Sequence, residues 1–144
     1  MIIRYAYLVF VLLCLCNLPV NADTMERDQA GNNAAQAYIM CNNALVTGNA
    51  EIVYSCLSVR LRQQTKQTVT LETIRQQLSS MAKLAVQDVS VSDFYMIKDT
   101  VNLNVNGNVQ EFKTGQRSMQ KGIVTMRIEN GIWRIVRERW GIQG

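Results

Sequence analysis

The sequence contains no histidine, and this absence excludes several kinds of chemistry at once. Ser-His-Asp and Cys-His nucleophilic sites need a histidine as their base, and most transition-metal sites use imidazole ligands. The eight glycines are isolated from one another, so the chain has no glycine-rich phosphate loop and no dinucleotide-binding fingerprint. We therefore predict no metal and no cofactor, and we assign no catalytic residue.

Charge and glycosylation signals are also scarce. The formal net charge is +4, which falls to +3 if the first 22 residues, including Arg4, are removed. This is too small a charge to indicate nucleic-acid binding. No Asn-x-Ser/Thr glycosylation site occurs in the sequence, which favours a bacterial envelope over a eukaryotic secretory pathway.

Residues 1–22 have the layout of a secretory signal peptide. Arg4 is the one cation of a short n-region, residues 6–18 form an apolar h-region, and Pro19 ends it. The segment closes on Val-Asn-Ala, which offers small residues at the −3 and −1 positions of a cleavage site. We therefore predict cleavage after Ala22 and a periplasmic or secreted protein.

Removal of this segment leaves 122 of the 144 residues, the length of one ordinary domain. Residues 23–33 are polar, and we expect them to form a flexible N-terminal segment. We expect residues 34–144 to form the folded domain.

Two alternatives would keep the protein at a membrane. The apolar run of residues 5–16 could remain as an anchor facing the periplasm, although a spanning helix needs roughly 20 residues. Cys16 could instead be lipidated, as in a bacterial lipoprotein, although Leu15 stands where a small residue is expected. We expect membrane contact only in these two cases.

Of the four cysteines, Cys14 and Cys16 fall in the signal segment, so Cys41 and Cys56 remain. These two stand seven residues before and eight residues after Gly48, where two helical patterns meet. In an antiparallel helical hairpin both would lie roughly 10–12 Å from the turn. Because an exported protein can be oxidised, we predict a disulfide between them. Two buried free thiols are the alternative.

Three stretches have the apolar periodicity of α-helices. The first covers residues 34–46. The second covers residues 50–64 and follows Asn49, and the third covers residues 71–84 and follows Thr70. Asparagine and threonine are both good N-cap residues, so we expect each to begin its helix.

The C-terminal half alternates apolar and polar residues, as β-strands do. Asn106-Gly107 and Asn130-Gly131 both suit two-residue type I′ turns, in which both central residues need a positive φ. The predicted hairpins join residues 101–105 to 109–112 and residues 123–129 to 132–140.

The second hairpin has the clearer pattern and predicts its own register. Arg127 would stand opposite Arg134, which is unfavourable alone, and Glu129 would lie diagonal to Arg134 and relieve the repulsion. The other predicted pairs are Ile128 with Trp133 and Met126 with Ile135. Helices followed by a meander of strands predict an α+β protein, with the N-terminal helices packed on one face of a curved antiparallel sheet.

Two stretches resemble the nuclear transport factor 2-like superfamily, the cystatin-like α+β roll, and its exported bacterial members in particular. Residues 37–58 are similar to the helix, Gly-Asn turn and helix that open such domains. Residues 124–135 are similar to the closing hairpin, whose last strand begins Gly-x-Trp-x-Ile. The resemblance implies a cone-like roll, often with a pocket between helices and sheet, and frequent dimerisation through the sheet. It implies no single activity.

The aromatic and methionine side chains suggest a pocket inside such a cone, although ordinary core packing would also explain them. Isomerases of this superfamily use Asp and Tyr as acid and base in the cone, so an Asp/Tyr pair is an alternative here. The candidate acid–base residues are Asp88, Asp93, Asp99, Tyr38, Tyr54 and Tyr95. The candidate pocket residues are Tyr38, Tyr54, Phe94, Met96 and Met126.

The C-terminal strand interleaves arginine with tryptophan, two residue types that are enriched at protein interfaces. An ordinary solvated Arg/Glu face is the alternative interpretation. The candidate binding surface comprises Arg127, Trp133, Arg134, Arg137, Arg139 and Trp140.

We therefore predict a non-enzymatic binding or assembly module of the bacterial cell envelope, for which a component of a secretion or surface apparatus is one role. It would bind a protein partner, or a second copy of itself, through the sheet face. Two other functions fit the sequence: a small-ligand-binding protein or Asp/Tyr acid–base enzyme that uses the cone, and an inhibitor or immunity-type protein.

Overall fold

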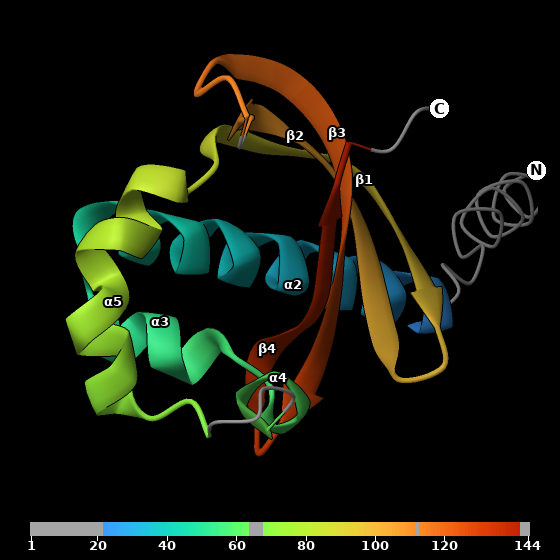
Figure 1. The fold of residues 1–144 in the computed structure, drawn as a ribbon. Helices are drawn as coiled ribbons and strands as arrows, with labels where there is room; N and C mark the ends of the chain where they lie inside the picture. Colours follow the sequence, from blue (N-terminus) through green and yellow to red (C-terminus); the bar gives the residue numbers. More distant parts are fainter. Residues whose placement is uncertain (1–21, 64–67, 112, 142–144) are drawn as a thin grey trace, which may run out of the picture.

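The computed structural model describes residues 22–63, 68–111 and 113–141 (Figure 1). Helices come first and strands follow, and the strands pair in chain order, all antiparallel. The α+β architecture predicted from the sequence is therefore confirmed. The elements are α2 (Ala22–Thr47), α3 (Ala50–Cys56), α4 (Val59–Gln63), α5 (Leu71–Leu84), β1 (Gln87–Ile97), β2 (Thr100–Gln110), β3 (Arg117–Glu129) and β4 (Ile132–Trp140).

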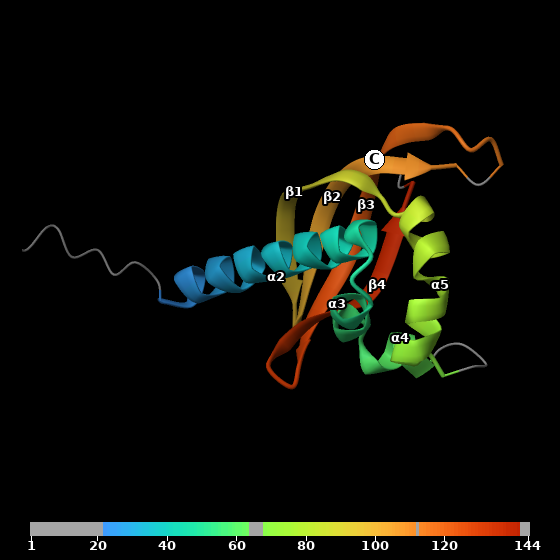
Figure 2. The same ribbon diagram turned by 90° about the vertical axis from the view of Figure 1, so that its left-hand side faces the viewer.

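The helices cover one face of the curved sheet, and α2 runs across the strands (Figure 2). The core lies between α2 and the two central strands. Tyr38 and Ala34 of α2 meet a row of fully buried side chains on the inner face of the sheet. That row comprises Val101, Leu103 and Val105 of β2 and Val124 and Met126 of β3.

Helix α2 covers residues 22–47, so it starts twelve residues before the predicted helix of residues 34–46. Its first two turns are exposed and polar, and Figures 1 and 2 both show this end projecting past β1. The helix reaches the sheet at Gly31, where a Cβ atom would collide with the ring of Phe94. An apolar stripe was thus a poor guide to where this helix begins, because its first turns have no packing partner. The predicted flexibility of residues 23–33 stays a prediction.

The predicted second helix, residues 50–64, is wrong as one element, because the chain leaves helical geometry at Leu57. Leu57 forms a parallel bridge with Ile135 of β4, and the Ser58 amide donates to the Ile135 carbonyl at 3.1 Å. Ser58 is the N-cap of α4, because its hydroxyl accepts a hydrogen bond from the Leu61 amide. Pairing with the sheet therefore outcompetes continuation of the helix. Asn49 and Thr70 cap α3 and α5 as predicted.

The two Asn-Gly pairs have different roles. Asn130 and Gly131 both have positive φ, 54° and 76°, and form the predicted turn between β3 and β4. The prediction of a turn at Asn106-Gly107 is wrong, because β2 runs straight through it. Glycine is needed at position 107 because of close packing and not because of a turn. A Cβ there would lie 2.5 Å from Val86 Cγ1.

The strand register predicted for the second hairpin is confirmed at all three pairs of residues: Arg127–Arg134, Ile128–Trp133 and Met126–Ile135. Beyond Ile135 the register shifts by one residue, so that Thr125 pairs with Arg137 and Val136 is extra. This bulge reverses which residues of β4 face the helices. Trp133 and Ile135 face them before the bulge, and Glu138 and Trp140 face them after it.

The disulfide between Cys41 of α2 and Cys56 of α3 is present, with a Cα–Cα distance of 5.9 Å. It joins the two helices on either side of the Gly48-Asn49 turn, as the sequence predicts.

Across the described residues, no helix has both the length and the apolar character needed to cross a membrane. The predicted signal peptide lies outside the described residues except for Ala22, and so do the alternative anchor and Cys16. Export therefore stays a prediction.

Candidate functional site

A cavity of about 410 Å³ lies between the helices and the inner face of the sheet. Helices α2, α3 and α5 form its helical walls. Strand β4, Val109 of β2 and the segment before β1 complete the wall. Its wall is mostly apolar. The lining residues are Tyr38, Cys41, Asn42, Leu45, Val53, Cys56, Leu57, Met81, Leu84, Ala85, Val86, Val109, Ile135, Glu138 and Trp140.

Glu138 is the one carboxylate in this wall, and it stays exposed to solvent at the cavity rim. Its Oε1 atom accepts two hydrogen bonds, from the Tyr38 hydroxyl at 2.8 Å and from the Trp140 indole nitrogen at 2.6 Å. These two donors come from opposite walls, since Tyr38 is on α2 and Trp140 is on β4. The carboxylate is therefore held in one orientation by both layers of the fold.

Tyr38 is only 1% exposed. Its burial raises the pKa of its hydroxyl well above the ordinary value of 10.0, and the negative charge of Glu138 and the hydrogen bond to it add to the rise. The hydroxyl therefore keeps its proton and serves as a hydrogen-bond donor throughout the physiological range.

Two glycines make room for the Trp140 ring on the sheet. A Cβ on Gly122 of β3 would lie 2.9 Å from Trp140 Cδ2, and a Cβ on Gly107 of β2 would lie 3.2 Å from Trp140 Cη2. The indole therefore rests against backbone where neighbouring strands carry no side chain. This contact orients the indole nitrogen toward Glu138.

Asn42 supplies another polar group of the wall. Its side-chain nitrogen donates to the Val86 carbonyl at 2.9 Å, which ties α2 to the segment before β1. Within the described residues, the oxygen of this amide accepts no hydrogen bond. The disulfide also belongs to the wall, because Cys41 and Cys56 both line the cavity.

Among the five predicted pocket residues, the structure places Tyr38 in this wall. Met126 is fully buried beneath the sheet, and Phe94 packs against Gly31 at the sheet edge. Met96 is exposed on β1, and Tyr54 packs in a second cluster between α3 and α5, with the Arg62 guanidinium 4.8 Å above its ring.

The candidate acid–base residues do not come together. Asp88 and Asp93 are exposed on β1, Asp99 is exposed in the turn between β1 and β2, and Tyr95 is exposed on β1. None of these four lines the cavity. The carboxylate that stands beside a buried tyrosine is instead Glu138.

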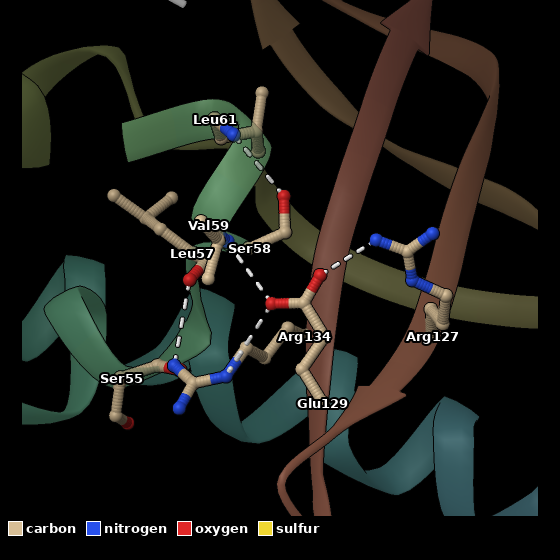
Figure 3. A network of polar contacts seen from close by, with 8 residues as sticks. All are labelled: Ser55, Leu57, Ser58, Val59, Leu61, Arg127, Glu129 and Arg134. Atoms are coloured by element: carbon tan, nitrogen blue, oxygen red, sulfur yellow. Dashed lines mark hydrogen bonds and ion pairs between the residues drawn. The ribbon is translucent and has the colours of Figure 1, made fainter. Parts of the chain in front are cut away.

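Arg134 was predicted to belong to an exposed surface, but its side chain is only 11% exposed (Figure 3). Its guanidinium donates to the Ser55 and Leu57 carbonyls at the end of α3, and its Nε lies 3.8 Å from Glu129 Oε2. Arg134 therefore holds the α3–α4 junction against β4.

Glu129 joins three elements in the same network (Figure 3). Its two oxygens accept hydrogen bonds from the Val59 amide at 3.0 Å and from Arg127 at 2.7 Å. Burial alone would raise the pKa of Glu129. The hydrogen bonds from Arg127 and Val59, with the charges of Arg127 and Arg134, outweigh that effect and hold the pKa below its usual range. Glu129 contacts both Arg127 and Arg134, in the position that the sequence predicts, and the relief of their repulsion stays a prediction.

The remaining members of the predicted surface lie on two faces. Trp133 and Trp140 pack against the core on the helix side. Arg137 and Arg139 are exposed, and they pair with Thr125 and Ile123 on the outer face of the sheet. The bulge at Val136 causes this separation.

The chain was compared with known proteins. No protein-family model matches the chain, and no curated relative does so. The fold does resemble solved structures. A variant of the protein named Rd1NTF2_05 shares 16% identity at a TM-score of 0.51, covering 76% of this chain and 98% of that one. A candidate ketosteroid isomerase from Shewanella frigidimarina shares 18% identity at a TM-score of 0.53, covering 75% of this chain and 94% of that one.

A third structure, a nuclear transport factor 2-like protein from Cytophaga hutchinsonii, shares 21% identity at a TM-score of 0.49, covering 75% of this chain and 97% of that one. The chain thus has the nuclear transport factor 2-like fold that the sequence resemblance implies. That fold serves binding modules and isomerases alike, so it leaves the specific role to the site.

Proposed function

We propose that this protein is a non-enzymatic binding module whose cavity takes up a small, largely apolar molecule. The observation that carries the proposal is the open, mostly apolar cavity of about 410 Å³. Concave apolar sites with a few placed polar groups are the usual form of small-molecule sites. Leu45, Met81 and Leu84 supply the apolar contacts, while Glu138 and Asn42 supply the polar ones.

The absence of an assembled Asp/Tyr pair favours binding over acid–base catalysis. The candidate aspartates stand on β1 and its turn, away from the cavity. Tyr38 and Glu138 are joined to each other, so the tyrosine proton is already directed at the carboxylate.

Protein-observed NMR with a library of small apolar and aromatic compounds tests this proposal. We expect hits that shift the Trp140 indole resonance and raise the melting temperature. Leu45→Trp would fill the cavity and should abolish these shifts, while Val46→Trp, at an exposed position of the same helix, should leave them. Hits that bind Leu45→Trp equally well would refute the cavity as the site.

We place this module outside the cytoplasm, in the periplasm or secreted. This part of the proposal rests on the signal-like sequence of residues 1–22 and on the disulfide, which forms in oxidising compartments. N-terminal sequencing of the exported protein should find Asp23 first. A lipid-modified Cys16 would replace the cleavage prediction.

A second candidate function is self-association through the outer face of the sheet. In one row across the strands, Asp93 of β1 stands at one edge and Arg139 of β4 at the other. In a dimer with two-fold symmetry and the outer faces of the two sheets in contact, β1 of each copy would lie over β4 of the other. Asp93 of each copy would then lie near Arg139 of its partner. Tyr95 and Ile97, 42% and 54% exposed, add apolar area beside the acidic edge.

Sedimentation of the protein at several concentrations tests this assembly. Arg137→Glu with Arg139→Glu should lower the dimer fraction without lowering the melting temperature, because both side chains are exposed. Arg134 is unsuitable for this test, since it holds the α3–α4 junction. Unchanged sedimentation of the double variant would count against the outer face.

A further inference from the structure

We propose that the molecule bound in the cavity is an organic cation, whose positive charge lies against Glu138 while its apolar part enters the cavity. This inference rests on the proposed binding function and specifies its ligand. It follows from the supply of donors and acceptors in the wall, from the charges around Glu138, and from the apolar lining beside it.

The strongest free polar group of the wall is an acceptor, because the tyrosine and indole donors are already engaged. The Tyr38 hydroxyl and the Trp140 indole nitrogen both donate to Glu138 Oε1. The Asn42 side-chain nitrogen donates one of its two hydrogens to the Val86 carbonyl. What remains for a ligand is Glu138 Oε2, together with the second hydrogen and the oxygen of the Asn42 amide. A positively charged group finds a carboxylate oxygen there, whereas an anion finds no cation in the lining.

Glu138 carries a charge that the described part of the protein does not neutralise. Within residues 22–63, 68–111 and 113–141, no lysine or arginine nitrogen lies within 4.0 Å of its carboxylate. Its sequence neighbours Arg137 and Arg139 are cations, but the strand directs them to the other face of the sheet. By contrast, the partly buried Glu129 is paired with Arg127 and Arg134.

The surroundings of Glu138 suit an organic cation better than a hydrated inorganic one. Tyr38 and Trp140 hold the carboxylate through their hydroxyl and indole N–H groups, so Glu138 is fixed in position before a ligand arrives. The rest of the wall is apolar, and it would take up a hydrocarbon group rather than a shell of water.

A matched pair of probes isolates the charge. Benzyltrimethylammonium and neopentylbenzene have the same shape, and only the first is charged. Each is titrated into the purified protein while the Trp140 indole resonance is followed. We expect the cation to bind about tenfold more tightly than its neutral isostere, the scale of a partly desolvated ion pair.

Glu138→Gln then removes the charge while its amide oxygen still accepts from Tyr38 and Trp140. It should reduce cation binding about tenfold and leave neopentylbenzene binding unchanged. Glu26→Gln is the control, since it changes the net charge equally at an exposed site at the far end of α2. The comparison of the two probes on the unmodified protein holds even if the Glu138 variant folds poorly.

Three outcomes separate the two proposals. Preferential cation binding that depends on Glu138 supports both. Equal binding of the two probes overturns the cation inference and leaves the cavity as an apolar binding site. Absence of binding by either probe, together with no hits in the compound library, overturns both.

Discussion

The Tyr38 hydroxyl donates its hydrogen bond to a carboxylate 100 residues further along the chain, Glu138, and so joins α2 to β4. The tyrosine is buried and the carboxylate is exposed, so the bond links the core to the cavity rim. Stability, pH dependence and the proposed ligand binding therefore all depend on this pair.

The raised pKa of Tyr38 predicts a loss of stability in alkali. The unfolded chain releases this proton near pH 10 and the folded chain retains it, so the free energy of unfolding falls as the pH rises above about 10. Tyr38→Phe should remove this fall and should lower stability by about 1 kcal/mol at neutral pH through the lost hydrogen bond. Urea unfolding from pH 7 to 11 measures both effects. The control is Tyr95→Phe, on the exposed face of β1, and an equal change of slope in that variant would contradict the assignment to Tyr38.

The lowered pKa of Glu129 predicts the opposite dependence in acid. Its stabilising contribution is present above the unfolded value of about 4.3 and is lost as the pH falls through the lower folded value. Glu129→Gln should therefore be less stable than the native chain at pH 7. Its melting temperature should also fall less steeply as the pH is lowered. Thermal melts from pH 7 to 2 measure this, with Glu26→Gln as the exposed control. If the melting temperature of Glu129→Gln falls with pH as steeply as that of the native chain, another group is responsible.

Removing the Arg134 side chain should destabilise the protein strongly, because it leaves two backbone carbonyls and Glu129 without their partner. We expect Arg134→Met to cost about 3 kcal/mol. Arg137→Met, three residues further on the same strand and exposed, should change stability by less than about 0.5 kcal/mol. Chemical denaturation compares the two variants. Similar small effects in both would mean that the network in Figure 3 contributes little to stability.

The disulfide should stabilise the fold and preserve the cavity wall. It closes a loop of 15 residues, so replacing both Cys41 and Cys56 by alanine should cost about 3 kcal/mol. Because both cysteines line the cavity, the double variant should also bind cavity ligands more weakly. Mass spectrometry of the non-reduced protein should show the two residues linked. Two thiols that react with an alkylating agent in the exported protein would refute the linkage.

A methyl group at Gly122 should displace Trp140. The new Cβ would lie 2.7 Å from the Arg139 carbonyl oxygen and 2.9 Å from the indole ring. We expect Gly122→Ala to cost about 1–3 kcal/mol, as overpacking does, and to change the Trp140 indole resonance. At Gly131, nothing lies within 4 Å of the corresponding position, and asparagine tolerates its positive φ. Gly131→Asn should therefore be close to neutral, and a loss as large as that of Gly122→Ala would argue against steric crowding as the cause.

The parts of the fold that could be predicted depend on local signals. Asn130-Gly131 forms its turn because both residues adopt the positive φ that the sequence suggests. Asn49 and Thr70 begin their helices because a cap needs only the neighbouring amides. The disulfide follows from nearly equal distances, seven and eight residues, on either side of Gly48.

The errors have distant causes. Asn106-Gly107 has the composition of a turn, but Gly107 instead makes room for Val86 and Trp140. Likewise, the break at Leu57 is set by β4, nearly 80 residues away. The sequence around Gly107 and around Leu57 contains no signal that would predict these distant contacts.

Glu138 was missed for a related reason. It stands among arginines in a strand whose alternation suggests a solvated face, and the extra residue Val136 turns it toward the cavity. A bulge leaves no reliable mark in a single sequence. Only Tyr38 among the predicted pocket residues carried a usable signal, its place on the apolar stripe of α2.

The bridge between Leu57 and Ile135 also bears on how this protein avoids aggregation. A free strand edge is a template on which other chains can add strands. The short extended segment at Leu57 and Ser58 occupies part of the β4 edge, with Arg134 fixing it in place. The opposite edge, β1, carries two irregularities in its pairing with β2, and such bulges discourage strand addition. The interruption of the helix at Leu57 thus covers part of the β4 edge and hinders the addition of strands from other chains there.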